Sequence, residues 1–224
     1  MSESQQIIHS RHPPVKTGPK PGDNLASFLE SNPNNVPSSK PAFIRAHDGK
    51  PLSRGQLFDE SHSLAWSLVN KLSLQQGSRV GILSHNSLYY PVALHAHLLA
   101  GVTSVTLNPA YSVEELVHPL KDCKPEYIFA APALLPTIKE ALSKAGLPEK
   151  HPRSGLSTIW TLDDADDWKE KKQGGGVDNL RSLIDASQGQ KLQAVKVDDP
   201  TQRDAFICYS SGTSGKPKGV QLPQ

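Results

Sequence analysis

Short apolar runs alternate with segments of helical periodicity through the middle of the chain. Runs at residues 80–83, 102–107, 127–130 and 158–161 have the length and composition of buried strands. Between them, apolar residues recur at spacings of three and four, which predicts helices. Such alternation is typical of crossover units, in which helices cover parallel strands. The pattern therefore predicts an α/β fold with a mainly parallel sheet flanked by helices.

Local capping signals place the ends of several predicted helices. Ser53 and Gln56 fit a capping box, and Ser112 with Glu115 fits another. Gly101 stands where a helix that begins near Ser87 would need a C-terminal cap. A short first helix is predicted just after residue 23. Five further helices are predicted at residues 53–72, 87–100, 112–120, 134–147 and 179–186.

The N-terminal region has a different character. Residues 1–22 contain four prolines and few apolar side chains, so we expect a flexible tail. Residues 42–44 have strand character, and Asp48-Gly49 predicts a tight turn after them. Folded structure is therefore expected from about residue 23 onward.

One acidic segment interrupts the alternation at residues 162–178. Its carboxylates are Asp163, Asp164, Asp166 and Asp167. A metal site is one interpretation, but the spacing does not fit an EF-hand and a run of three glycines follows. We therefore favour a solvated loop. His95 and His97 are two residues apart, so on a helix they point to different faces and form no metal pair. No metal site is predicted.

The end of the chain carries the strongest chemical signal. An apolar strand-like run at 205–209 leads into a segment with glycines, hydroxyl side chains and lysines, and residues 220–222 alternate like a second strand. Backbone N–H groups of a glycine-rich loop, together with hydroxyls and a lysine, can hold a polyphosphate. Two familiar phosphate loops do not fit. A Walker A loop needs glycine where Ser210 stands and a hydroxyl where Pro217 stands. A dinucleotide fingerprint needs other glycine spacings and a following helix.

The segment 209–220, Tyr-Ser-Ser-Gly-Thr-Ser-Gly-Lys-Pro-Lys-Gly-Val, resembles the phosphate loop of the adenylate-forming superfamily. That loop has the form Ser-Gly-Thr-Thr-Gly-x-Pro-Lys-Gly. Here Ser214 replaces the second threonine and keeps its hydroxyl, and Lys216 fills the variable position. Weaker similarity to acyl-CoA synthetases and coumarate–CoA ligases extends upstream through residues 79–87 and 108–116, and covers 23–224 in all.

The resemblance implies a role in activating a carboxylic acid with ATP and Mg²⁺, with CoA as the expected acceptor. The phosphate cradle would consist of Ser210, Ser211, Gly212, Thr213, Ser214 and Gly215, with Lys218 close by. Residues 23–224 would be the first part of the large N-terminal AMP-binding domain, without a C-terminal domain. The catalytic residues would lie downstream of residue 224, so we expect an inactive fragment of a longer ligase. A non-catalytic interaction or regulatory domain is the alternative.

The composition and charge of the chain limit the class of protein and its binding partners. The chain has 224 residues, 36% hydrophobic and 21% charged, which predicts a globular protein. A net charge of +2 and scattered basic residues give no indication of nucleic-acid binding. The distant Cys123 and Cys208 suggest no disulfide. The sequence shows no signal peptide, membrane span or peroxisomal address. We therefore expect a cytoplasmic protein, with a peroxisomal location left open for a longer parent.

Overall fold

A central sheet organises the chain. The computed structural model describes residues 25–32, 34–164, 178–210 and 217–224. Within these ranges, the sheet has six strands in the order β6-β5-β3-β4-β7-β8. They are β3 (Arg79–Leu83), β4 (Thr103–Leu107), β5 (Tyr127–Ala130), β6 (Ile159–Thr161), β7 (Asp204–Ser210) and β8 (Lys218–Pro223). The first five run parallel, and β8 is antiparallel to β7. The predicted α/β class with a mainly parallel sheet is confirmed.

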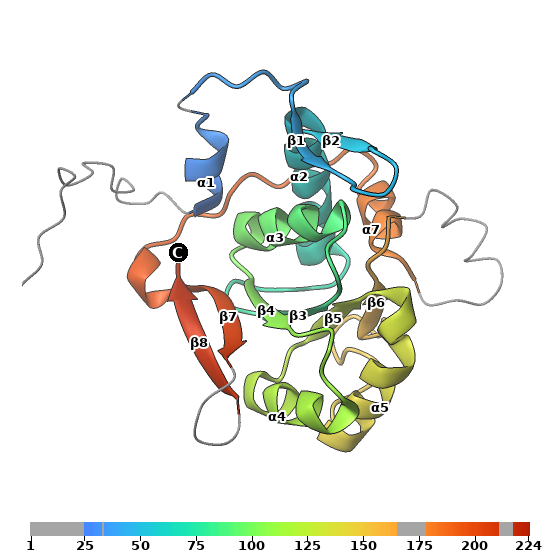
Figure 1. The fold of residues 1–224 in the computed structure, drawn as a ribbon. Helices are drawn as coiled ribbons and strands as arrows, with labels where there is room; N and C mark the ends of the chain where they lie inside the picture. Colours follow the sequence, from blue (N-terminus) through green and yellow to red (C-terminus); the bar gives the residue numbers. More distant parts are fainter. Residues whose placement is uncertain (1–24, 33, 165–177, 211–216) are drawn as a thin grey trace, which may run out of the picture.

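Helices cover both faces of this sheet (Figure 1). One face carries α2 (Arg54–Asn70), α3 (Tyr89–Ala100) and α7 (Leu180–Ala186), and the other carries α4 (Val113–Cys123) and α5 (Leu135–Ala145). Because successive side chains of a strand point to opposite faces, each buried strand serves two cores. Phe129 packs in the core under α2 and α3, whereas its neighbour Ile128 packs against α4 and α5. Burial on both faces explains the continuous apolar runs in the sequence.

The remaining elements are short. They are α1 (Leu25–Glu30), the hairpin strands β1 (Pro41–Ile44) and β2 (Pro51–Ser53), and the 3₁₀ turns η1 (Pro132–Leu134) and η2 (Pro200–Gln202). Gly49 has a φ of 73° in the turn between β1 and β2, so the predicted strand and turn are confirmed. The expected flexible tail at residues 1–22 lies outside the described residues. Among the helices that the structure describes, none has the length and apolar content needed to cross a bilayer.

The predicted caps set the helix boundaries. The Ser53 hydroxyl accepts the Gln56 N–H at 3.2 Å, and Gln56 Oε1 accepts the Ser53 N–H at 3.0 Å. Ser112 and Glu115 form the second capping box. Gly101 ends α3 with a φ of 65°, and a Cβ there would lie 2.8 Å from a methyl group of Val195. Glycine is therefore required at this position both by its backbone angle and by the available space.

A histidine lies inside the core. The His97 side chain on α3 is fully buried, stacks on the ring of Phe129, and has its Nδ1 2.8 Å from the Ser104 hydroxyl. His95 is only half buried, and its Nδ1 lies 2.7 Å from the Pro91 carbonyl. The two histidines therefore serve separate environments, as predicted. Burial lowers the pKa of His97 to about 3, so its imidazole is neutral in the folded protein.

One residue of the acidic segment departs from the interpretation as a solvated loop. Asp166 and Asp167 lie outside the described residues, but Asp164 is not solvated. Its carboxylate accepts the backbone N–H groups of Leu88 at 2.9 Å and Tyr89 at 3.2 Å, and its side chain is only 14% exposed. These N–H groups begin α3 and have no partner within the helix. Asp164 thus caps α3 from a distance of 75 residues in sequence, which no local pattern could indicate.

We expect Asp164→Ala to lower the free energy of unfolding by about 1–2 kcal/mol, because it leaves two helix-terminal N–H groups without an acceptor. Urea denaturation followed by circular dichroism measures this. Asp164→Asn keeps an acceptor oxygen and should cost less, and the exposed Asp198→Ala serves as a matched control. Equal stability of Asp164→Ala and the control would contradict this role.

Candidate functional site

The glycine-rich segment lies between the last two strands. β7 and β8 pair antiparallel, and the register places Ser210 opposite Lys218. Both residues are exposed. The structure thus brings together the first and the last of the predicted site residues at the mouth of one hairpin. The others, Ser211, Gly212, Thr213, Ser214 and Gly215, lie outside the described residues. Among the described residues after the loop, Lys218–Pro223 form β8 and not the helix of a Walker A arrangement, so the predicted second strand is confirmed.

The sheet topology sets where this hairpin opens. β7 runs parallel to β4, with Thr106 beside Cys208. Because β3 to β7 are parallel, their carboxyl ends share one edge of the sheet, and Ser210 ends β7 at that edge. Open α/β sheets bind their ligands in the crevice outside the carboxyl ends of the strands. The candidate site therefore stands where this architecture favours a ligand.

A tyrosine holds one side of the hairpin to α4. The Tyr209 hydroxyl donates a hydrogen bond of 2.6 Å to Asp122 and lies 3.0 Å from the Cys123 sulfur. Burial, and then these hydrogen bonds, raise the pKa of Tyr209 above its ordinary value. Burial also raises the pKa of the Cys123 thiol. Both groups therefore stay protonated near neutral pH and act as a structural clamp rather than as a base or a nucleophile.

The other side of the hairpin is held by a histidine of the same helix. His118 Nε2 donates to the Pro217 carbonyl at 3.0 Å, and its ring meets Tyr209 edge-on at 6.3 Å. Tyr209, which precedes Ser210, and Pro217, which precedes Lys218, thus both form hydrogen bonds with side chains of α4. Sequence reasoning missed this clamp. Its only local signal is the spacing of four between His118 and Asp122, which places them on one helix face.

Gly219 has a packing role. It lies opposite Tyr209 in the strand pair, and a Cβ at 219 would stand 3.3 Å from that ring and 3.2 Å from a methyl of Ile207. The absence of a side chain therefore lets the Tyr209 ring lie across β8. This motif glycine serves the clamp, whereas the predicted cradle glycines precede Pro217.

The charges at the hairpin mouth fit an anionic ligand. No carboxylate within the described part of the chain forms an ion pair with Lys218. An exposed, unpaired ammonium beside Ser210 suits a polyphosphate. No group of three or more His, Cys, Asp or Glu side chains gathers as a metal site among residues 25–32, 34–164, 178–210 and 217–224.

Comparison with known proteins identifies the family. The family model of AMP-binding enzymes matches residues 29–224, which is most of the chain. The chain belongs to the AMP-binding enzyme family. It matches the peroxisomal OPC-8:0-CoA ligase 1 of Arabidopsis thaliana at 26% identity, over 97% of this chain and 36% of that ligase.

Solved AMP-binding enzymes share the fold. The long-chain-fatty-acid-CoA ligase of Archaeoglobus fulgidus superposes with a TM-score of 0.71 at 25% identity, over 91% of this chain and 37% of that one. ATP-bound MatB of Rhodopseudomonas palustris superposes with a TM-score of 0.62 at 25% identity, over 90% and 35%. The chain thus resembles the N-terminal part of acyl-CoA ligases and spans little more than a third of the length of the relatives described here.

Proposed function

We propose that this chain is the phosphate-binding N-terminal portion of an ATP-dependent carboxylic acid–CoA ligase. The observation that supports this most is the hairpin: a segment with the superfamily's loop pattern leaves the carboxyl edge of a parallel sheet, with Ser210 and Lys218 paired at its mouth. In this reaction a carboxylate attacks the α-phosphorus of ATP, pyrophosphate leaves, and the acyl-adenylate passes to CoA.

The hairpin's part in this reaction is to hold the β- and γ-phosphates. Backbone N–H groups and the hydroxyls of Ser210, Ser211, Thr213 and Ser214 would bind the phosphate oxygens. Lys218 would offset the negative charge of the departing pyrophosphate, which is positioning with electrostatic stabilisation. Mg²⁺ would accompany the nucleotide through its phosphate oxygens. The clamp on α4 would keep the base of the loop fixed while these contacts form.

A hairpin chimera tests this proposal. Residues 204–223 of this chain replace the corresponding hairpin of the Archaeoglobus fulgidus ligase, and acid-dependent exchange of pyrophosphate into ATP is measured. We expect exchange within about tenfold of the unaltered ligase, because the motif and strand frame match. The 224-residue chain alone should show no exchange, since it spans only 36% of a ligase such as the Arabidopsis relative.

Two results would contradict the proposal. One is a folded chimera that binds the acid but does not exchange pyrophosphate, because the hairpin would then be no phosphate loop. The other is robust acid-dependent exchange by the isolated chain, because the site would then be complete within it.

The uncovered edge strand favours a second candidate function. Among the described residues, β8 is the outermost strand, and Val220 and Leu222 on it are 46% and 43% exposed. Such an edge can pair with another extended segment. A non-catalytic interaction domain would use β8 in this way, and it would not require the phosphate loop to function in the chimera.

A further inference from the structure

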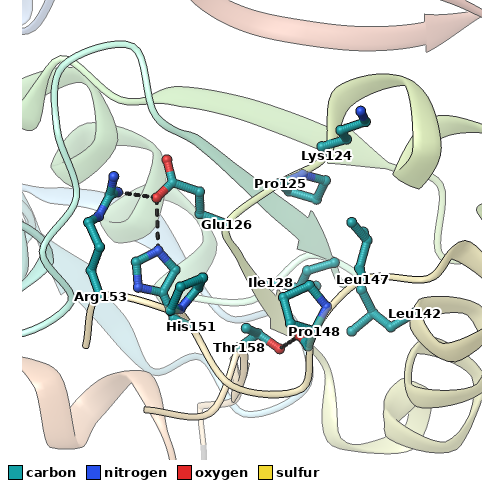
Figure 2. A pocket seen from close by; sticks show the side chains of 11 residues that line it. Lys124, Pro125, Glu126, Ile128, Leu142, Leu147, Pro148, His151, Arg153 and Thr158 are labelled. Carbon is teal, nitrogen blue, oxygen red and sulfur yellow. Dashed lines mark hydrogen bonds and ion pairs between the residues drawn. The ribbon is translucent and has the colours of Figure 1, made fainter. Parts of the chain in front are cut away.

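A pocket lies away from the hairpin, and Figure 2 shows the side chains that line it. It is a pocket of about 310 Å³ whose lining includes residues that come directly before β5 and β6. The amino ends of these parallel strands therefore surround it, whereas the phosphate hairpin stands at their carboxyl ends. Nothing in the ligase proposal uses this pocket. At the small end of the range of ligand sites, it suits a small molecule.

The floor of the pocket is apolar. Ile128 and Leu142 belong to the buried core, and Leu147 and the prolines 125 and 148 extend this surface outward. The Thr158 hydroxyl is already engaged, since it donates to the Pro148 carbonyl at 2.8 Å. A ligand would therefore bury an apolar body against the floor, and any polar group would have to stay at the rim.

The carboxylate of Glu126 lies at the rim of the pocket, and its negative charge is already paired within the protein. The Glu126 carboxylate lies 2.9 Å from His151 Nε2 and also pairs with Arg153 (Figure 2). His151 Nδ1 accepts the Ser154 N–H at 3.3 Å, so Nε2 carries the proton given to Glu126. This cluster is internally satisfied and leaves no net negative charge to attract a cation.

Lys124 supplies a positive charge that could pair with an anionic ligand. It lies beside Pro125, away from His151 and Arg153 in the view of Figure 2, and no described residue forms an ion pair with it. Its backbone is left-handed, with a φ of 46° and a ψ of 58° at the end of α4. Glycine is the residue favoured there. A lysine in this conformation is less favourable than glycine, as are the other left-handed residues Ser73 and Gln188.

We propose that this pocket binds a small amphipathic anion, with its hydrocarbon chain on the floor of Ile128, Leu142 and Leu147 and its anionic group at Lys124. A short unbranched carboxylate matches both the pocket volume and the separation of apolar floor from cationic rim. The site is independent of the phosphate hairpin, so the proposal stands whether or not the ligase assignment holds.

The test is an NMR titration of the ¹⁵N-labelled chain with sodium hexanoate. We expect saturable shifts confined to the amides around the pocket, with a dissociation constant of about 1 mM. 1-Hexanol, which has the same chain length without the charge, should bind about fivefold more weakly. Acetate, which has the charge without the chain, should give no saturable shift at these amides.

Two variants distinguish the contribution of the Lys124 charge to binding from that of the apolar floor. Lys124→Gly should weaken hexanoate binding about fivefold and leave hexanol binding unchanged. It should also raise Tm by about 2 °C, because glycine relaxes the left-handed backbone, so loss of binding cannot reflect loss of fold. Leu147→Trp should fill the pocket and abolish binding of both ligands. Gln188→Gly is the matched control, since Gln188 is left-handed at a φ of 51° elsewhere.

The outcomes are decisive. Hexanoate and hexanol binding with equal affinity would overturn the anion assignment, as would full hexanoate affinity in Lys124→Gly. Shifts that do not saturate, that scatter over the surface, or that persist in Leu147→Trp would overturn the site itself.

Discussion

Lys218→Ala in the hairpin chimera should slow adenylate formation by about tenfold to a hundredfold. Lys218 lies opposite Ser210 at the mouth of the hairpin and has no competing ion pair among the described residues. Loss of one charge-assisted contact to the departing pyrophosphate is worth about 1.5–3 kcal/mol, which gives this range of rates. Single-turnover adenylation at saturating ATP is the measurement.

Lys216→Ala is the matched control, since it removes the same charge two residues away at the position that the superfamily leaves variable. We expect it to change the rate less than threefold. Thr213→Ala should fall between the two, because a neutral hydroxyl contributes only about 0.5–1.5 kcal/mol. Equal losses at the two lysines would show that the loop acts through its overall charge, and the role given to Lys218 would be wrong.

Acidification from pH 7 to pH 5 should destabilise the fold through His97 by about 2 kcal/mol. Its pKa is about 3 in the folded protein and about 6.5 when unfolded. Between these values the unfolded state binds the extra proton, so stability falls as the pH falls below about 6.5. Urea denaturation at the two pH values measures the change.

The comparison with His97→Asn isolates this effect. Asparagine places an amide near the position of Nδ1 and can keep the contact with Ser104, but it does not titrate. The variant should be less stable at pH 7 because it leaves a cavity, yet its loss between pH 7 and pH 5 should be about 2 kcal/mol smaller. Other titrating groups, such as His62, whose pKa is raised chiefly by its hydrogen bond to Glu30, contribute equally to both proteins. Parallel pH profiles would contradict the assignment.

The elements could be predicted because their signals are local. Doubly buried strands appear as apolar runs, and both capping boxes involve residues three apart. Boundaries shifted by one to three residues, and the largest shift is at the end of α4, which reaches Cys123 rather than residue 120. The helix predicted for residues 134–147 is Leu135–Ala145, because η1 precedes it and Gly146 ends it with a φ of 73°. Cys208, within the apolar run that leads into the loop, is only partly buried and pairs with Val220 of the edge strand β8.

The strand order and the clamp could not be predicted, because they depend on contacts between distant residues. Tyr209 and Asp122 are 87 residues apart, and Asp164 and Leu88 are 76 apart. Periodicity shows that each residue belongs to an element, but not which element will lie beside it. For the site, the sequence pattern indicated the loop's chemistry, whereas its attachment to α4 required the fold.

The sheet order also has a consequence for synthesis on the ribosome. β4 pairs with β7 through residues such as Thr106 and Cys208, which are 102 positions apart. At translation rates of about 5–20 residues per second, roughly 5–20 s pass between the emergence of the two strands. During that interval β3, β4 and β5 can assemble while one edge of β4 has no partner. Among the described strands, β7 and β8 are then the last to dock, so the nascent chain can assemble β3, β4 and β5 well before this hairpin.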